Sequence, residues 1–132
     1  MKAGRELDAK HIVNLVATEV MGWQENEGMV PLAWTTPDGQ LRTYEETSFK
    51  SFNPWEDIAA AWEVVERVLA TWTDDSCLPE FRVQRYKQPG WEAYFGAEYE
   101  SYEPTFWHYW AEGNMAPEAI CLAALKAKGV KA

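Results

Sequence analysis

Residues 53–72 read NPWEDIAAAWEVVERVLATW, and this stretch predicts the central helix around which the rest of the chain is arranged. Asn53 can cap free backbone N–H groups, Pro54 suits the first helical position, and Glu56 stands where a capping box places an acid. Apolar residues then recur at helical spacing. The predicted buried face, which we expect to pack against a sheet, consists of Ile58, Ala61, Trp62, Val65, Val68, Leu69 and Trp72.

The chain before this helix contains a second amphipathic pattern. Ile12, Val16 and Val20 recur every fourth residue, which predicts a helix over residues 5–21, and Gly22 follows as a left-handed C′ residue. Between Gly22 and Asn53 the helical periodicity fails. Residues 29–34 and 41–44 are short extended segments separated by Pro37-Asp38-Gly39, so we predict an irregular hairpin there.

The chain after the central helix alternates apolar and polar residues. Residues 81–86 and 91–95, separated by Pro89-Gly90, predict a β-hairpin, and residues 105–110 predict a third strand. Residues 96–104 form an acidic loop that could be a lid, a partner-binding tip or a simple connection. A last helix is predicted from Ala116-Pro117-Glu118 to Gly129.

The predicted elements are grouped by type along the chain. Their order is one helix, an irregular hairpin, the central helix, three antiparallel strands and a short helix. Grouped strands favour the α+β class over a doubly wound sheet. We therefore predict one domain over residues 1–132, in which an antiparallel sheet of about three to five strands packs with helices as an α-β-α sandwich.

The composition limits the classes of partner. The formal net charge is −9, so the surface repels phosphate backbones and we expect no binding to nucleic acid polymers, unless the charge serves DNA mimicry. The chain has no signal peptide pattern and no stretch of about 20 apolar residues, so we expect no membrane interaction and a cytoplasmic location. Cys121 lies within AICL, where a thiol behaves as a small buried hydrophobe.

Three stretches of the chain together resemble a known family. They are residues 3–9 leading to 20–23, residues 57–66 and residues 116–127. In this order they resemble the phage ABA sandwich domain family, small proteins encoded by phages and prophages. The resemblance implies an α/β sandwich and a phage or prophage origin, and it brings no catalytic motif. The chain departs from the family pattern in residues 10–13 and in the acidic loop before Pro104.

Motifs for metal binding and catalysis are absent from the sequence. The two histidines, His11 and His108, stand in no H-x-x-H or H-E-x-x-H arrangement, and there is no C-x-x-C pair. The chain also has no G-x-S-x-G motif and no glycine-rich phosphate loop. We therefore expect no metal ligands, no catalytic residues and no cofactor.

Aromatic and basic residues are concentrated in the last three predicted strands. The chain has eight Trp, six Tyr and five Phe, more rings than a core of this size requires. Rings can stack on bases, and guanidinium groups bind phosphate or carboxylate. The alternative is that the rings form the core face of the sheet and the arginines lie at its rim. The candidate ligand-binding residues are Arg82, Arg85, Trp91, Tyr94, Trp107, His108, Tyr109 and Trp110.

These features favour a binding protein over an enzyme. The first hypothesis is a non-enzymatic, homo-oligomeric binder of a small anionic nucleotide-like ligand, acting as a counter-defence sponge for a host immune signal. Its link to counter-defence is an analogy with other small phage proteins. The alternatives are a protein that inhibits a host defence enzyme by contact and a hydrolase of small phosphoesters.

Overall fold

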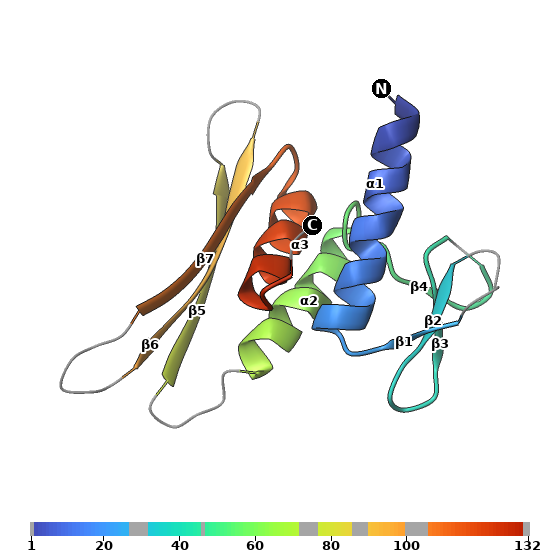
Figure 1. Ribbon diagram of the computed structural model, residues 1–132, viewed down its shortest axis with the longest axis horizontal. Helices are drawn as coiled ribbons and strands as arrows, with labels where there is room; N and C mark the ends of the chain where they lie inside the picture. The colour runs from blue at the N-terminus through green and yellow to red at the C-terminus, as the bar shows by residue number, and fades with distance from the viewer. Residues whose placement is uncertain are drawn as a thin grey trace.

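The computed structural model describes residues 2–26, 32–45, 47–71, 77–85, 90–99 and 106–130, with the backbone alone at residues 2–8, 77–78, 97–99 and 106–108. Within these ranges, three helices form a layer between two sheets (Figure 1). The helices are α1 (Lys2–Leu15), α2 (Ile58–Ala70) and α3 (Ala116–Ala127). The α+β class and the predicted order of elements are confirmed.

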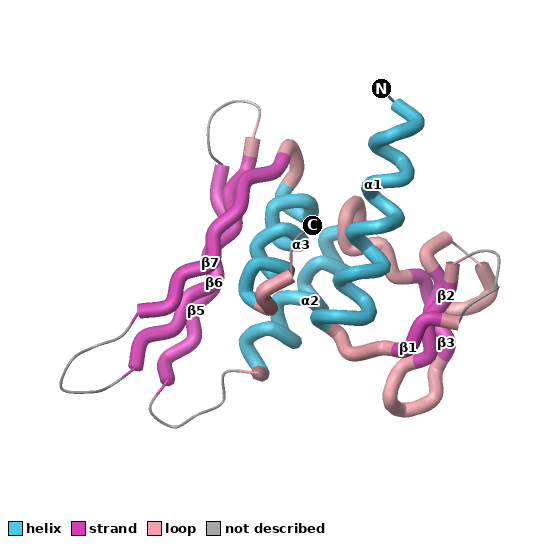
Figure 2. Tube along the Cα trace, viewed as in Figure 1, coloured by secondary structure: helices cyan, strands magenta, loops and turns pink. Residues whose placement is uncertain are grey.

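The strands separate into two sheets, a feature that the sequence pattern did not indicate. The first sheet has the order β1 (Gln24–Glu25), β2 (Ala33–Thr35), β3 (Leu41–Thr43) and β4 (Lys50–Ser51). The second is antiparallel and has the order β5 (Cys77–Arg85), β6 (Trp91–Tyr99) and β7 (Phe106–Gly113). Because the helices lie between the two groups of strands, the groups cannot share backbone hydrogen bonds (Figure 2).

The first helix continues past Leu15 as a π-helical turn, η1 (Val16–Val20). Val16 and Val20 are buried and Ile12 packs partly buried against the same core, which confirms the predicted apolar stripe. The helix ends at Gly22, whose φ of +73° lies in the left-handed region that favours glycine. The amide of Trp23 then donates a hydrogen bond of 2.9 Å to the carbonyl oxygen of Ala17, so the chain turns back over the last turn of the helix.

The start of α2 differs from the prediction. The helix begins at Ile58, and its N-cap is Asp57, whose Oδ1 accepts a hydrogen bond of 3.1 Å from the Ala59 amide. The predicted cap, Asn53, instead belongs to a separate turn, in which its carbonyl oxygen accepts a 2.8 Å hydrogen bond from the Asp57 amide. The chain thus contains two adjacent start signals, and the later one begins the helix.

The buried face of α2 was also predicted incorrectly in part. Ile58 and Trp62 are 51% and 48% exposed, and Trp72 lies outside the described residues. Because α2 lies in the middle layer and packs against η1 and α3, small side chains that allow close approach of helices take the buried positions. The buried residues are Ala60, Ala61, Val64, Val65 and Val68.

The predicted hairpin and third strand are confirmed as β5, β6 and β7. Strand β6 continues to Tyr99, so the prediction of a loop was wrong for residues 96–99, while residues 100–105 lie outside the description. Gly96 pairs with Glu80 on one side and His108 on the other. A Cβ atom at Gly96 would overlap the phenol ring of Tyr94, so glycine allows that ring to lie along the strand.

The third helix covers one face of the second sheet (Figure 1). The Glu118 carboxylate accepts hydrogen bonds of 2.9 and 3.2 Å from the amides of Asn114 and Met115, which satisfies free donors at the helix start. Cys121 is fully buried, as predicted. Within the described ranges, no helix is both long and apolar enough to cross a lipid bilayer.

Candidate functional site

The second sheet has two chemically different faces because successive side chains of a strand alternate between them. The inner face packs on the helices through Phe81, Ala93, Phe95 and Ala111. The helices all lie on this side of the sheet in the described part of the chain (Figure 2). The opposite side, here called the outer face, carries Glu80, Arg82, Gln84, Glu92, Tyr94, Trp110 and Glu112.

Three of the predicted site residues form a row across the outer face. Arg82 of β5 is the register partner of Tyr94 in β6, and Tyr94 is the register partner of Trp110 in β7. The guanidinium carbon of Arg82 lies 4.8 Å from the centre of the Tyr94 ring, which is a cation–π contact. Trp110 is 41% exposed. Adjacent strands therefore place one guanidinium group and two large rings side by side.

Glu92 holds one end of this row in place. Its Oε2 accepts a hydrogen bond of 2.7 Å from Nε1 of Trp110, and its Oε1 accepts one from Nε2 of Gln84. The hydrogen bond from Gln84, the hydrogen bond from Trp110 and the positive charge of Arg82 lower the pKa of the Glu92 carboxyl below its usual value. Glu92 is therefore ionised at neutral pH.

These side chains surround a shallow hollow. It is lined by Arg82, Gln84, Glu92, Tyr94 and Trp110 and has a volume of about 110 Å³. Sites that enclose a drug-sized ligand have volumes of about 300–1,000 Å³. The hollow has room for one ring or one anionic group, and a larger ligand would extend over the open sheet.

Arg82 has a second partner at the edge of the hollow. Its Nε lies 2.9 Å from Oε1 of Glu80, and both side chains are more than half exposed. An ion pair between such exposed groups contributes little to stability, on the order of 0–1 kcal/mol. The guanidinium group can therefore exchange this carboxylate for an anionic ligand at small cost.

The other predicted site residues do not join this row. Trp91 and Tyr109 belong to the inner face and pack against the core. Arg85 lies over the Trp91 ring at 5.5 Å, at the end of the hairpin. The side chains of Trp107 and His108 lie outside the described part of the structure, although their backbones pair with Ala97 and Gly96.

Sequence reasoning missed two residues that line the hollow, Gln84 and Glu92. The period of two along each strand was the signal that could have found them. Gln84 is two residues from Arg82, Glu92 is two residues from Tyr94, and the two are register partners. Neither residue is a ring or a basic side chain, the two types on which the predicted site was based.

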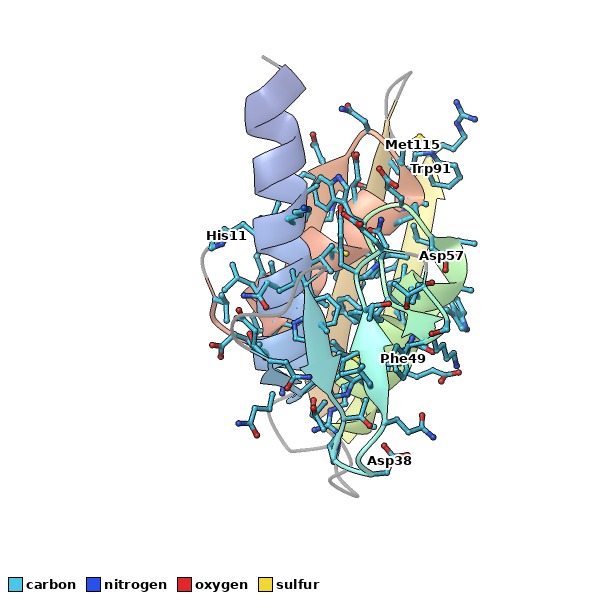
Figure 3. All side chains as sticks on the ribbon, turned by 90° about the vertical axis from the view of Figure 1, so that its right-hand side faces the viewer. His11, Asp38, Phe49, Asp57, Trp91 and Met115 are labelled. Carbon is cyan, nitrogen blue, oxygen red and sulfur yellow. The ribbon has the colours of Figure 1, made fainter. Side chains whose placement is uncertain are left out.

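His11 and Cys121 are the described residues away from the outer face whose side chains are most often reactive in proteins. No three His, Cys, Asp or Glu residues gather among them in a way that could hold a metal ion. His11 lies on the side of the molecule opposite Trp91 (Figure 3). Burial raises the pKa of the Cys121 thiol, and the charge of Glu118 raises it further, so this thiol is not a nucleophile at neutral pH.

Comparison with known proteins identifies the family. No curated protein and no solved structure matches the chain. The family model of the phage ABA sandwich domain matches residues 14–125, which include η1, both sheets and nearly all of α3. The match begins after the 3–9 stretch and includes the other two stretches in which the resemblance was found, apart from the last two residues, 126 and 127. This chain of 132 residues is a phage protein and belongs to the phage ABA sandwich domain family.

Proposed function

We propose that this phage protein is a non-enzymatic binding protein and that the outer face of the second sheet is its ligand-binding surface. The ligand is a small anionic nucleotide-like molecule, and the protein sequesters it as a host immune signal in the bacterial cytoplasm. The observation that supports this proposal is the row formed by Arg82, Tyr94 and Trp110 on adjacent strands.

The chemistry of the row suits a ligand that has both a phosphate and a base. The guanidinium group of Arg82 offers forked donors to phosphate oxygens. The half-exposed indole of Trp110 offers a flat surface on which a base can stack, and Glu92 fixes its orientation. One group of the ligand enters the hollow and the remainder lies along the sheet.

The overall charge favours a small ligand over a polymer. A net charge of −9 repels a long phosphate backbone, whose many charges meet the whole acidic surface. A ligand with one or two phosphates interacts mainly with the local field of Arg82, the basic residue that lines the hollow. The carboxylates of Glu80 and Glu92 beside Arg82 limit how much negative charge the site accepts.

Isothermal titration calorimetry with a panel of cyclic dinucleotides and ADP-ribose derivatives tests this proposal. At least one member of the panel is expected to bind, and Arg82→Ala is expected to weaken that binding by about tenfold or more, because a charge-assisted hydrogen bond is lost. Lys10→Ala is the control, since it removes one exposed positive charge from α1, far along the chain from the sheet. Absence of heat with every member of the panel contradicts the proposal.

One observation favours a second candidate function, the inhibition of a host enzyme by contact. The hollow is shallow, and its side chains include Trp, Tyr and Arg, the residue types that most often anchor protein interfaces. Affinity capture from host lysate with the wild type and Trp110→Ala separates the two functions. A stoichiometric host protein retained by the wild type and lost by the variant favours inhibition, and a released nucleotide favours sequestration.

A further inference from the structure

Within the part of the chain that the structure describes, an edge strand of the second sheet lies beside an exposed apolar surface of α2. The strand order places β5 at one edge of the sheet, and α2 packs beneath this strand. The ring of Trp62 meets that of Phe81 edge-on, with a centroid distance of 5.6 Å. Trp62 and Ile58, one helical turn apart, are about half exposed. We call Ile58, Trp62 and Phe81 the apolar ledge.

The position of the ledge follows from the packing of α2. Its buried residues, such as Ala61 and Val65, belong to the core shared with η1 and α3. Both α2 and α3 contact β5, and the ring of Trp62 on α2 packs against Phe81 of this edge strand. The arrangement of α2, α3 and β5 can be followed in Figure 2. The apolar ledge therefore lies next to the edge strand β5, with Trp62 in contact with Phe81.

Two residues of opposite charge flank Phe81 on β5. Glu80 precedes it and Arg82 follows it, and both side chains belong to the outer face. In an antiparallel pair of two identical β5 strands related by a two-fold axis at Phe81, each Glu80 stands opposite the Arg82 of the other copy. Such an isologous contact contains two equivalent ion pairs.

Neighbouring registers lack this complementarity. A two-fold axis at Glu80 or at Arg82 places that charged residue opposite itself, and like charges in direct opposition are destabilising. An axis between two residues pairs Phe81 with a residue of the outer face, which conflicts with the burial of its ring against Phe95. Among the registers centred on Phe81 and on its two neighbours, only the one centred on Phe81 therefore pairs opposite charges.

We propose that a second copy of this chain docks on the apolar ledge, with the two β5 strands paired antiparallel about Phe81. The two sheets then form one six-stranded sheet, and the Trp62 rings of both copies cover its underside. Pro79 has no N–H to donate to Val83 of the second copy, which confines the shared ladder to a short central stretch. Each Arg82 then lies opposite the Glu80 of the other copy, and the outer faces of the two copies form one continuous surface.

Sedimentation velocity of the full chain and of charge variants tests this interface. The wild type is expected to be a dimer. Glu80→Arg alone opposes arginine to arginine, and Arg82→Glu alone opposes glutamate to glutamate, so each variant is expected to weaken dimerisation by about tenfold or more. An equimolar mixture of the two single variants restores opposite charges at both positions and is expected to sediment as a heterodimer.

Two further variants test whether the effect depends on the pairing of Glu80 with Arg82 and not on a charge change alone. The exchange Glu80→Arg with Arg82→Glu in one chain is expected to form a dimer again, and Glu112→Arg, the same charge change on β7, is expected to remain dimeric. A monomeric wild type overturns the proposal. Single variants that remain dimers, or folded single variants that do not associate when mixed, overturn it as well. Nucleotide binding is read by calorimetry, so either proposal can fail without the other.

Discussion

Nε1 of Trp110 and Oε2 of Glu92 are joined by a hydrogen bond of 2.7 Å between two adjacent strands of the outer face. The other carboxylate oxygen of Glu92 accepts a hydrogen bond from Gln84 on β5. One carboxylate therefore links all three strands of the second sheet and sets the orientation of the indole beside the hollow. Both hydrogen bonds favour the ionised form of the Glu92 carboxyl.

The carboxyl group of Glu92 is predicted to titrate below the ordinary glutamate value of 4.5. Hydrogen bonds from Gln84 and Trp110 favour its charged form in the folded state, so Glu92 stabilises the fold above the unfolded-state pKa. This contribution is lost as the pH falls through the lowered folded-state value. NMR titration of the side-chain carboxyl carbon measures the pKa directly, and Glu92→Gln is expected to remove the corresponding pH dependence of stability. A titration midpoint above 4.5 contradicts the geometry.

Arg42 is predicted to be important for the attachment of the first sheet to the helices. It is only 6% exposed, and its guanidinium group donates hydrogen bonds of 2.9 Å to the Ser51 carbonyl oxygen and 3.0 Å to Glu63 of α2. It also lies over the rings of Trp23 and Phe52, at 5.0 and 5.3 Å. Arg42→Met is expected to lower the free energy of unfolding by about 2–3 kcal/mol, because it leaves Glu63 without its closest partner. Denaturant unfolding measures this loss.

Two control variants separate the roles of charge and geometry at Arg42. Arg42→Lys is expected to restore little of the stability, because an ammonium group cannot make the forked and stacked contacts. Lys50 also faces Glu63, at 3.6 Å, but is 71% exposed. Lys50→Met is expected to change the unfolding free energy by no more than about 0.5 kcal/mol. Equal losses for Arg42→Met and Lys50→Met contradict this interpretation.

The thiol of Cys121 is predicted to be unreactive in the native protein. It is completely buried in α3, and burial raises its pKa, so the reactive thiolate is both rare and inaccessible. In a Cys77→Ser variant, where Cys121 is the remaining thiol, modification at neutral pH is expected to be about a thousandfold slower than in denaturant. Rapid modification under native conditions indicates that α3 separates readily from the core.

The sequence predicted the types and order of the elements well because these depend on local patterns. The period of four in Ile12, Val16 and Val20 and the period of two in β5 both survive in the fold. The start of α2 was harder to predict from the sequence, because Asn53 and Asp57 are both good N-cap residues. Local sequence does not choose between them, and the structure uses Asp57. The extension of β6 through Gly96 also depends on partners far along the chain.

The candidate site was predictable only in part. Arg82, Tyr94 and Trp110 lie on one face, but Trp91 and Tyr109 are also aromatic and lie on the other. Residue type alone does not reveal the face, whereas the register of three strands does. The role of Arg42 gave no signal in the sequence, because its partners Ser51 and Glu63 come from two other elements.

Ligand-binding NMR tests the central claim, that the outer face binds a small anionic nucleotide, most directly. Cyclic dinucleotides and ADP-ribose are titrated into isotope-labelled protein while the side-chain N–H signals of Arg82 and Trp110 are observed. We expect saturable shifts at these two signals and at the backbone amide of Tyr94, with the signals of α1 unchanged. Shifts that appear only elsewhere in the molecule, or no saturable shift with any of these nucleotides, would contradict the claim.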